Sequence, residues 1–410
     1  MSNTTSQAIP HGYLSTLIVI DLFICSLMCL PLLLYHCNRH TPSIRYRKPN
    51  LMSIAALWSS IYSISRCVIE LNQSKINCTA MTLVYGVSLQ TTLMAYFLAE
   101  LSVVLTFKLT EMMIRYNEKH ITQQGALIKL QYLLRNRHLT IAWIVIQLVW
   151  NTPLFVIIYT GPDYTMYDGN NCPLELRNRF VPLSIIQYSI IGIATMRLSY
   201  SMSKVVDNFG LRIAFQRCGR AMCLVLLCYL PFSILHDESF VLDSHLEFFI
   251  AAFGGQLIHL FHIIGPVRQV FKEKIFDQNT FKGTEGILEA FLSTESGFNA
   301  FTEFAKGEYE YEAVVAWKAL ADFKAGTDDC LSATEIYQTH IYLQAPLSLR
   351  RFISANLLER YETAYEGNTK YGIHPDVAHD SESFNLILAE LMIYLVYSTL
   401  PRFQLHPLGV

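Results

Sequence analysis

Residues 246–274, LEFFIAAFGGQLIHLFHIIGPVRQVFKEK, divide this chain into two parts of different composition. The first two-thirds of the stretch is almost entirely apolar. After Pro266 it becomes a short basic run that contains Arg268, Lys272 and Lys274. The sequence before it consists mostly of long apolar segments, whereas the sequence after it has the mixed composition of a water-soluble domain. The stretch therefore predicts the junction between a membrane-embedded part and a soluble part.

The charge of the chain is also divided at this junction. The 410 residues carry a net charge of −2, but from Glu285 onward there are 18 Asp or Glu and only 8 Lys or Arg. The soluble part is therefore acidic and the preceding part basic, as expected of a membrane protein with basic inner loops. The basic residues lie in short, separate loops, which excludes an extended nucleic-acid-binding surface.

Seven segments approach or reach the length needed to cross a bilayer, about 20 mostly apolar residues. The sixth is the weakest, because it is short and contains Pro231, but neighbouring helices can satisfy the carbonyl that a proline frees. The pair Gly254-Gly255 in the seventh predicts a close contact with another helix. The seven predicted spans are 14–35, 51–71, 81–105, 139–159, 180–200, 220–235 and 246–270.

The distribution of basic residues predicts how these spans are oriented. The loops after spans one, three, five and seven, together with Arg220 and Arg268 at the adjoining span ends, hold 18 Lys or Arg, whereas the N-terminus and the other loops hold three. Basic loops face the cytoplasm, so we expect a multi-pass plasma-membrane protein with its N-terminus outside and its C-terminus inside. Three glycosylation triplets, at Asn3, Asn72 and Asn77, lie in segments that this rule places outside. The first span is predicted to be an uncleaved signal anchor.

Two of the ten cysteines fall on the predicted outer side. Cys78 lies at the head of the third span and Cys172 in the loop between the fourth and fifth spans. Both would face an oxidising compartment, in which disulfides persist. Their spacing resembles that of the bridge between the third helix and second outer loop of seven-helix receptors, and this resemblance implies a disulfide. The alternative is two free thiols.

Ionisable residues inside the spans are costly and usually have partners. Asp21 and Arg66 lie at similar depths in spans one and two, so we expect them to pair, with Glu70 as a competing partner of Arg66. Glu100 and Arg197 are level in spans three and five and predict a second pair. These groups either bind a ligand or only stabilise the packing of the helices.

No cofactor or metal site is predicted. His259 and His262 lie one turn apart in the last span, but a metal would need further ligands and none stands out in the sequence. The cysteines form no CxxC pair, so a zinc knuckle is not expected.

The soluble part returns to an apolar spacing of three to four residues, and no period-two pattern appears, so it is predicted to be an all-helical bundle. We expect a membrane domain over 1–270, a linker over 271–283 and a soluble domain over 284–410. The apolar segment 384–400 is rather short and has Glu390 near its middle. It is therefore predicted to be the buried central helix of the bundle, not an eighth span. The fold class is all-α.

Several motifs occur along the soluble part, all within 286–407. They are Leu288-x-x-Phe291-Leu292, Phe301-x-x-Phe304-Ala305, Glu312 five residues before Trp317, Ile336-Tyr337 leading to 345–349 (APLSL), and the closing apolar helix that ends at Arg402-Phe403. With these motifs the soluble part resembles a regulator-of-G-protein-signalling (RGS) domain. With seven spans before it, the architecture is similar to that of the plant seven-helix RGS proteins, whose motif the run 301–305 (FTEFA) matches most closely.

This resemblance implies a binding partner and a mechanism. Such domains bind the switch regions of a Gα subunit and stabilise its GTP-hydrolysis transition state without a catalytic group of their own, so the protein is not expected to be an enzyme itself. The positions that match the contact residues of the family are Glu312, Leu347, Ser348, Ser398 and Arg402. For Glu312 and Arg402, the alternative is a solvated charge and a helix cap.

Three positions depart from the family pattern. Ala313 and Ser348 stand where many members have Asn, and Ser398 stands where an Asp partners the terminal Arg. Two readings of the soluble part follow, a domain that accelerates GTP hydrolysis by a diverged Gα and one that binds Gα without accelerating it.

We therefore expect a membrane-anchored regulator of a Gα subunit, under the control of an unknown extracellular ligand that favours one arrangement of the spans. The alternatives are a non-catalytic membrane scaffold and a G-protein-coupled chemoreceptor with a decoy tail.

Overall fold

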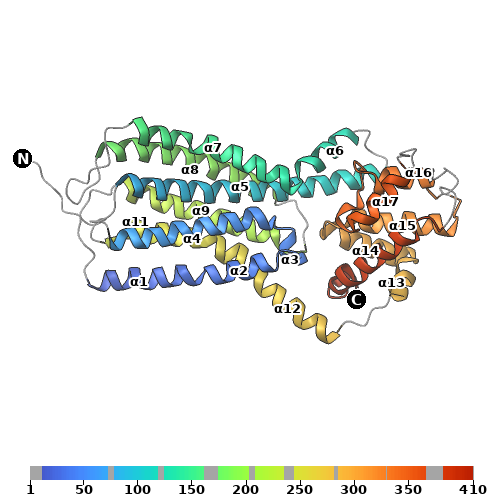
Figure 1. Cartoon of the computed structure of the whole chain (residues 1–410). Helices are drawn as coiled ribbons and strands as arrows, with labels where there is room; N and C mark the ends of the chain where they lie inside the picture. Colours follow the sequence, from blue (N-terminus) through green and yellow to red (C-terminus); the bar gives the residue numbers. More distant parts are fainter. Residues whose placement is uncertain are drawn as a thin grey trace, which may run out of the picture. The chain divides into compact units, whose positions relative to one another are not determined.

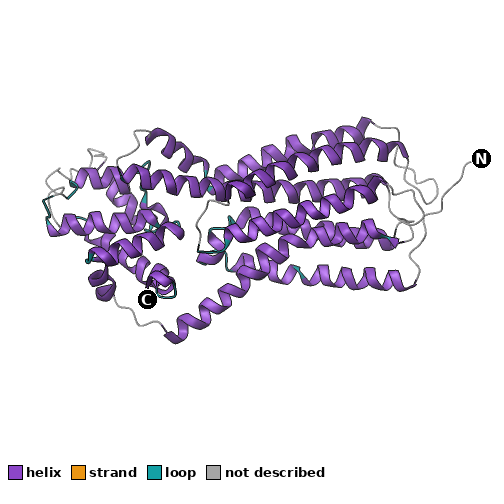
Figure 2. Ribbon diagram, turned by 180° about the vertical axis from the view of Figure 1, so that it is seen from behind, coloured by secondary structure: helices purple, strands orange, loops and turns teal. Residues whose placement is uncertain are grey.

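The computed structural model describes residues 12–72, 78–118, 124–160, 174–202, 208–234, 244–280, 285–328, 330–365 and 382–409. Within these ranges all regular structure is helical, as Figure 2 shows, and the predicted all-α fold is confirmed. The chain forms two compact units. The first comprises Met1–Val104, Asn136–Val205 and Gly210–Lys272, and the second comprises Leu105–Arg135, Val206–Phe209 and Glu273–Val410.

The first unit is built from long apolar helices that run side by side (Figure 1). Among the described residues up to Lys272, seven helices or runs of consecutive helices are long and apolar enough to cross a membrane, as predicted. They are α1 with α2 (Gly12–Leu27 and Cys29–Cys37), α4 (Pro49–Leu71), α5 (Cys78–Asn117), α7 (Asn136–Thr160), α8 (Leu174–Met202), α9 (Leu211–Ile234) and α11 (Leu246–Ile258) with its continuation, and a short α3 (Pro42–Arg45) follows α2.

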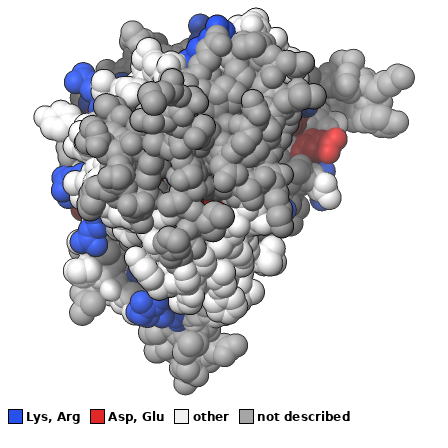
Figure 3. All heavy atoms as spheres, turned by 90° about the vertical axis from the view of Figure 1, so that its left-hand side faces the viewer, with Lys and Arg blue, Asp and Glu red and all other residues white. Residues whose placement is uncertain are grey.

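The outer surface of these helices is apolar. Val149 of α7, Ile193 of α8 and Leu227 of α9 are each more than 60 % exposed. In water such a surface would be unfavourable, whereas lipid tails are as apolar as these side chains. Figure 3 looks onto one end of these helices, where the charged side chains of the described residues lie mostly near the rim. The first unit therefore has the surface of a multi-pass membrane protein.

The stretch 246–274 forms one continuous run of α11, the π-helical turn η2 (His259–Ile264) and α12 (Gly265–Thr280). α11 packs against α4 and α9. A Cβ atom added to Gly255 would lie 2.3 Å from the Ser63 hydroxyl oxygen, and the Ser59 hydroxyl donates to the Gly255 carbonyl. This agrees with the predicted close helix contact. The predicted linker 271–283 begins inside α12, and the predicted domain boundaries stay a prediction.

The second unit contains a helical bundle around one apolar core. Trp317 and Leu320 are buried at its centre, with residues from the helices on either side. Local signals in the sequence position these helices: Ser332 and Glu335 form a capping box, and Gly326 ends one helix with φ of 64°. The elements are α6 (Gln124–Leu133), α13 (Glu285–Leu292), α14 (Glu295–Gly307), α15 (Tyr311–Ala325), α16 (Ala333–Ile336), η3 (Tyr337–Ile341), η4 (Leu349–Arg351), α17 (Ala355–Tyr365), α18 (Asn385–Tyr394), η6 (Leu395–Thr399), α19 (Leu400–Phe403) and η7 (Pro407–Gly409).

The continuous segment α18–η6–α19 lies in this core. By length and composition it counts as an eighth helix able to cross a membrane. However, Leu391 and Leu395 are fully buried in the core, and the Phe403 ring packs against Phe301 with centroids 4.9 Å apart. The carboxylate of Glu390 accepts hydrogen bonds from the backbone N–H and the hydroxyl of Ser354. The segment is thus the central helix that the sequence predicted.

Candidate functional site

The five residues predicted to bind Gα lie in the second unit, and Glu312 is in the first turn of α15. Its side chain is 2 % exposed, and Arg351 at the end of η4 donates from Nη1 to Glu312 Oε1 at 3.2 Å. An acidic side chain in the first turn is also favoured by the helix dipole. Glu312 is therefore buried and ion-paired, not a solvated charge. Arg351 ties it to the loop that contains Ser348.

Arg402 lies at the centre of a second network. Its Nε donates to Glu308 Oε2 at 2.7 Å, and its Nη2 lies 3.2 and 3.3 Å from the two carboxylate oxygens of Glu310. Its Nη1 donates to the carbonyl of Ser398 and lies 3.4 Å from the Ser398 hydroxyl. Arg402 thus has carboxylate partners, although Ser398 stands where the family pattern has Asp. The Arg402 side chain is 16 % exposed, so it is more than a helix cap.

The sequence did not identify Glu308 and Glu310 as partners of Arg402. The signal that could have found them is the spacing of Glu308, Glu310 and Glu312, which occupy every second position after the end of α14. Glu310 also accepts hydrogen bonds from the hydroxyls of Tyr394 and Thr399, both at 2.6 Å. Burial raises the pKa of Glu308 to about 7, against the opposing effect of the Arg402 guanidinium. The side chains of Glu308 and Glu310 are 2 % and 0 % exposed, so the network connects the α14–α15 loop to the last helix at a buried point.

Leu347 and Ser348 form the loop before η4. The Ser348 hydroxyl caps η4 by accepting from the Arg350 N–H. Leu347 is fully buried, and its carbonyl accepts from Nδ1 of His340 at 3.3 Å. Burial lowers the pKa of His340 to about 4. Leu347 is therefore buried, whereas a residue that contacts Gα would lie on the surface.

Within the second unit, the end of α5 and helix α6 cover Leu347. Leu109 and Met113 of α5 and Leu127 of α6 share one buried apolar cluster with Leu347 and Tyr311. Two polar contacts join the same elements: the side-chain amide of Asn117 donates to the Tyr311 hydroxyl at 3.1 Å, and that of Gln131 donates to the Pro346 carbonyl at 2.8 Å. Part of the predicted Gα-binding surface is thus already occupied by this chain.

The predicted pair of Asp21 and Arg66 is not formed. The Asp21 carboxylate accepts from the thiols of Cys25 and Cys67, at 3.8 and 3.6 Å. The Arg66 guanidinium lies over the Tyr85 ring, 4.6 Å from its centroid. Their helices do pack together, but the two side chains point to different neighbours. The sequence predicts how deep a residue lies in the membrane, but it does not determine toward which neighbouring helix the side chain points.

The competing partner of Arg66 is also engaged elsewhere. Glu70 accepts from Nδ1 of His245 at 2.6 Å. The second predicted pair is likewise not formed: Glu100 is fully buried and accepts from the Ser199 hydroxyl at 2.8 Å, whereas the Arg197 side chain is exposed. Arg197 lies two residues from Ser199 on α8, and this spacing turns the two side chains to different faces of the helix.

The predicted outer-side modifications lie largely outside the described residues. This applies to Asn3, Asn77 and Cys172, so the disulfide to Cys78 stays a prediction. Asn72 is described and ends α4, with its side-chain amide donating to the Val68 carbonyl at 2.9 Å.

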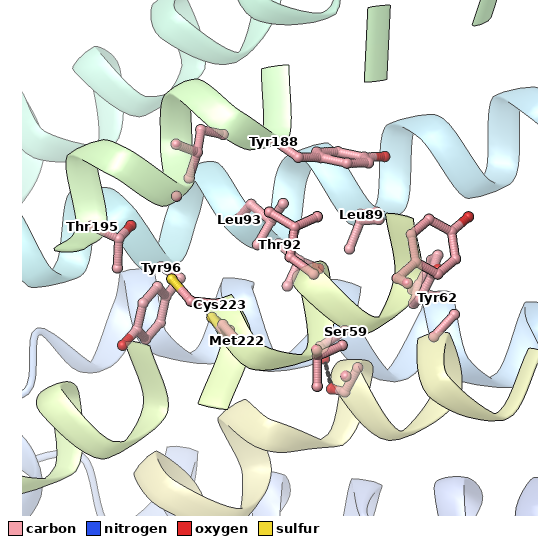
Figure 4. A pocket seen from close by; sticks show the side chains of 18 of the residues that line it. Ser59, Tyr62, Leu89, Thr92, Leu93, Tyr96, Tyr188, Thr195, Met222 and Cys223 are labelled. Carbon is pink, nitrogen blue, oxygen red and sulfur yellow. Dashed lines mark hydrogen bonds between the residues drawn. The ribbon is translucent and has the colours of Figure 1, made fainter. Parts of the chain in front are cut away.

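A cavity of about 110 Å³ lies among the helices of the first unit (Figure 4). It is lined by residues of α4, α5, α8, α9 and α11, and none of them is charged. Tyr62, Tyr96 and Tyr188 supply aromatic surface, and Figure 4 shows Thr195, Met222 and Cys223 toward one end. The lining suits an uncharged, mainly apolar molecule, because a charged one would lose its hydration without gaining a partner.

Comparison with protein families identifies the C-terminal part. Residues 288–408 match the regulator of G protein signaling domain. No curated protein and no solved structure matches the chain. The second part of the chain therefore contains an RGS domain, and several long apolar helices precede it.

Proposed function

We propose that this protein is a membrane-anchored regulator of heterotrimeric G-protein signalling that accelerates GTP hydrolysis by a Gα subunit. The observation that carries the proposal is the RGS domain, in which Glu312 and Arg402 are each held by buried ion pairs. A domain that contributes no catalytic group acts by binding the transition state of Gα more tightly than its ground state. Loops that are rigid before binding lose less entropy when they dock on the switch regions.

A non-catalytic scaffold is the second candidate, and two observations favour it. Ala313 and Ser348 replace side chains that would reach the switch loops, and each lost polar contact costs about 1–3 kcal/mol where its partner stays unsatisfied. Leu347 is covered by α5 and α6, so Gα would compete with this chain's own residues for the surface.

Single-turnover GTP hydrolysis distinguishes these functions. Full-length protein in lipid nanodiscs is added to GTP-loaded Gα subunits, and the hydrolysis rate is compared for wild type and Glu312→Lys. Glu303→Lys is the control, because Glu303 is 64 % exposed and lies outside both networks. We expect acceleration by wild type and by the control, and a loss of at least about tenfold in Glu312→Lys. Binding without acceleration would instead establish the scaffold, and faster GDP release would establish a receptor.

The finer features of the membrane part belong to the same proposal. We assign the protein to the plasma membrane, with the N-terminus outside and the RGS domain in the cytosol, because 18 basic residues lie in the loops predicted to face inward or at the adjoining span ends. Glycans at Asn3, Asn72 and Asn77 and a Cys78–Cys172 disulfide agree with this orientation. The architecture and the run 301–305 support membership of the plant seven-helix RGS group.

The cavity supports control by a ligand. A molecule that fits the cavity better in one arrangement of the helices than in another would shift their equilibrium by that difference in affinity. The uncharged lining favours a small lipophilic molecule over an ion or a polyhydroxylated one.

A further inference from the structure

Three helices of the first unit bring a carboxylate, two thiols and a side-chain amide together. Asp21 and Cys25 lie one turn apart on α1, and Cys67 lies on α4. Their ligand atoms, one from each side chain, are all within 4.8 Å of one another. Gln256 of α11 reaches the same point, with its amide nitrogen 3.1 Å from Cys25 Sγ. The sequence did not predict this cluster, because its members are far apart in the chain.

Two groups in the cluster lack the partner that their chemistry requires. Asp21 forms no ion pair with any described residue, although a carboxylate within an apolar helix is costly without one. The side-chain oxygen of Gln256 is buried without a hydrogen-bond partner, and the residue is only 7 % exposed. Both Cys25 and Cys67 are fully buried. The cluster is therefore rich in electron-pair donors, and no cationic side chain of the described residues pairs with it.

The distances fit a tetrahedral divalent metal. With Zn–S bonds of about 2.3 Å and Zn–O bonds of about 2.1 Å, tetrahedral geometry separates a sulfur from an oxygen by about 3.6 Å. The Cys25 sulfur lies 3.8 Å from Asp21 Oδ1 and the Cys67 sulfur lies 3.6 Å from Asp21 Oδ2, so a small rotation of the carboxylate would bring one oxygen to this distance from both sulfurs. A half-turn of the Gln256 amide would exchange its nitrogen and oxygen and would direct the oxygen toward the cluster.

We propose that Asp21, Cys25, Cys67 and Gln256 form a structural zinc site that joins α1, α4 and α11. Two sulfur ligands select Zn²⁺ over Mg²⁺ and Ca²⁺, which prefer oxygen ligands only. Binding converts the two thiols to thiolates and releases their two protons to solvent. Ile18, Phe248 and Ala252 pack around Cys67 and exclude water from the site. A closed site of this kind stabilises the arrangement of the helices and has no open position for catalysis.

Cobalt titration of full-length protein tests the site. The protein is purified in nanodiscs with reductant and chelator, the chelator is removed, and Co²⁺ is added. We expect one Co²⁺ per chain, with thiolate-to-metal charge-transfer absorption that Zn²⁺ abolishes. Cys25→Ser, Cys67→Ser and Asp21→Asn should each weaken binding at least about tenfold. Cys29→Ser and Cys228→Ser are matched controls, because neither residue belongs to the cluster, and they should bind as wild type does.

A second measurement needs no variant that might fail to fold. Cys25 and Cys67 are fully buried, so wild-type protein is heated in steps with a maleimide, with and without Zn²⁺, and the cysteines modified at each temperature are identified by mass spectrometry. Protection by Zn²⁺ of Cys25 and Cys67, but not of Cys29 and Cys228, supports the site. Equal modification with and without Zn²⁺ overturns it, as does a cobalt spectrum without charge-transfer absorption or one unchanged in Cys25→Ser. These readouts do not involve Gα, so their failure would leave the proposed function untouched.

Discussion

The most consequential side chain at the residue scale is Arg402. It forms ion pairs with two glutamates whose side chains are 2 % and 0 % exposed. These carboxylates lie in a loop in which Tyr309 adopts a left-handed backbone with φ of 57°, which costs a non-glycine residue about 1–2 kcal/mol. The ion pairs with the last helix stabilise this loop, which leads directly into Glu312. The loop that would meet Gα therefore depends on a residue almost at the end of the domain.

Replacing Arg402 with Met should strongly destabilise the RGS domain. The substitution leaves Glu308 and Glu310 buried without a cation, so we expect the free energy of unfolding to fall by about 3–5 kcal/mol. Lys306→Met is the control, because its partner Glu303 is exposed and such pairs contribute at most about 1 kcal/mol. Thermal unfolding of the full chain measures both. Equal effects of the two substitutions would contradict the account.

His340 should make the stability of the domain depend on pH. Burial lowers its pKa from 6.5 to about 4, so between these values the unfolded chain binds more protons than the folded one. The contribution of His340 to stability is therefore full above pH 6.5 and is lost as the pH falls toward 4, by up to about 3 kcal/mol, whereas the raised pKa of Glu308 contributes in the opposite direction. We expect His340→Gln to lose this dependence in thermal unfolding between pH 4 and 7. An unchanged slope in the variant would show that other groups cause it.

At the scale of elements, α5 and α6 have two roles. α5 begins in the first unit and its last residues belong to the second, where they and α6 cover Leu347 and Tyr311. Among the described residues, the covering contacts include one apolar cluster and two side-chain hydrogen bonds. If Leu347 contacts Gα, as the family pattern implies, Gα binding and α6 binding would exclude each other.

Releasing α6 should strengthen Gα binding. Leu127 is 2 % exposed within the cluster, and Leu127→Asp would place a charge against Leu347. If the covered form dominates, removing it should raise the apparent affinity for Gα on the order of tenfold. Ala126→Asp is the matched control, because Ala126 is exposed on the neighbouring face of α6. Equilibrium binding to transition-state-loaded Gα measures the effect, and unchanged affinity in Leu127→Asp would show that α6 does not compete.

The contact of α11 with α4 depends on Gly255. A Cβ atom there would lie 2.3 Å from the Ser63 hydroxyl oxygen, so Gly255→Ala should cost about 1–3 kcal/mol through overpacking. Gly265→Ala is the control, because an added Cβ meets no atom within 4 Å. We expect only Gly255→Ala to lower the unfolding temperature in nanodiscs. A similar loss in both variants would instead point to glycine's backbone flexibility.

At the scale of the whole molecule, the proposal requires that the chain crosses the bilayer an odd number of times. The apolar outer surface of the first unit and the asymmetric basic loops both support this arrangement. The apolar segment Asn385–Phe403 does not change the count, because its side chains are used in the core of the RGS domain.

An epitope tag after Val410 should therefore be inaccessible on intact cells. We expect antibody binding only after permeabilisation, whereas a tag before Asn3 should be accessible without it. Digestion with a glycosidase should also shift the electrophoretic mobility of the wild type and not of a variant that lacks all three glycosylation triplets. Detection of a C-terminal tag on intact cells would show that the RGS domain lies outside the cell, away from the G proteins, and would contradict the proposal.

The fold class, the positions of the apolar helices and the presence of an RGS domain could all be predicted from the sequence. These depend on patterns along the chain: apolar length, helical periodicity, the spacing of Phe301, Phe304 and Trp317, and the distribution of basic residues. Each is a local property, and the burial of Leu391 and Leu395 in the core is as the pattern predicts.

Only the tertiary structure decided which side chains meet. Asp21 and Arg66 were level in depth, yet Asp21 contacts two thiols and Arg66 lies over Tyr85, because the rotation of each helix about its axis decides its partners. The ion pairs of Arg402 with Glu308 and Glu310 likewise depend on how the last helix packs in the bundle. Leu347 is covered by residues more than 200 positions earlier in the chain, a contact that no local pattern encodes because packing depends on all the helices together.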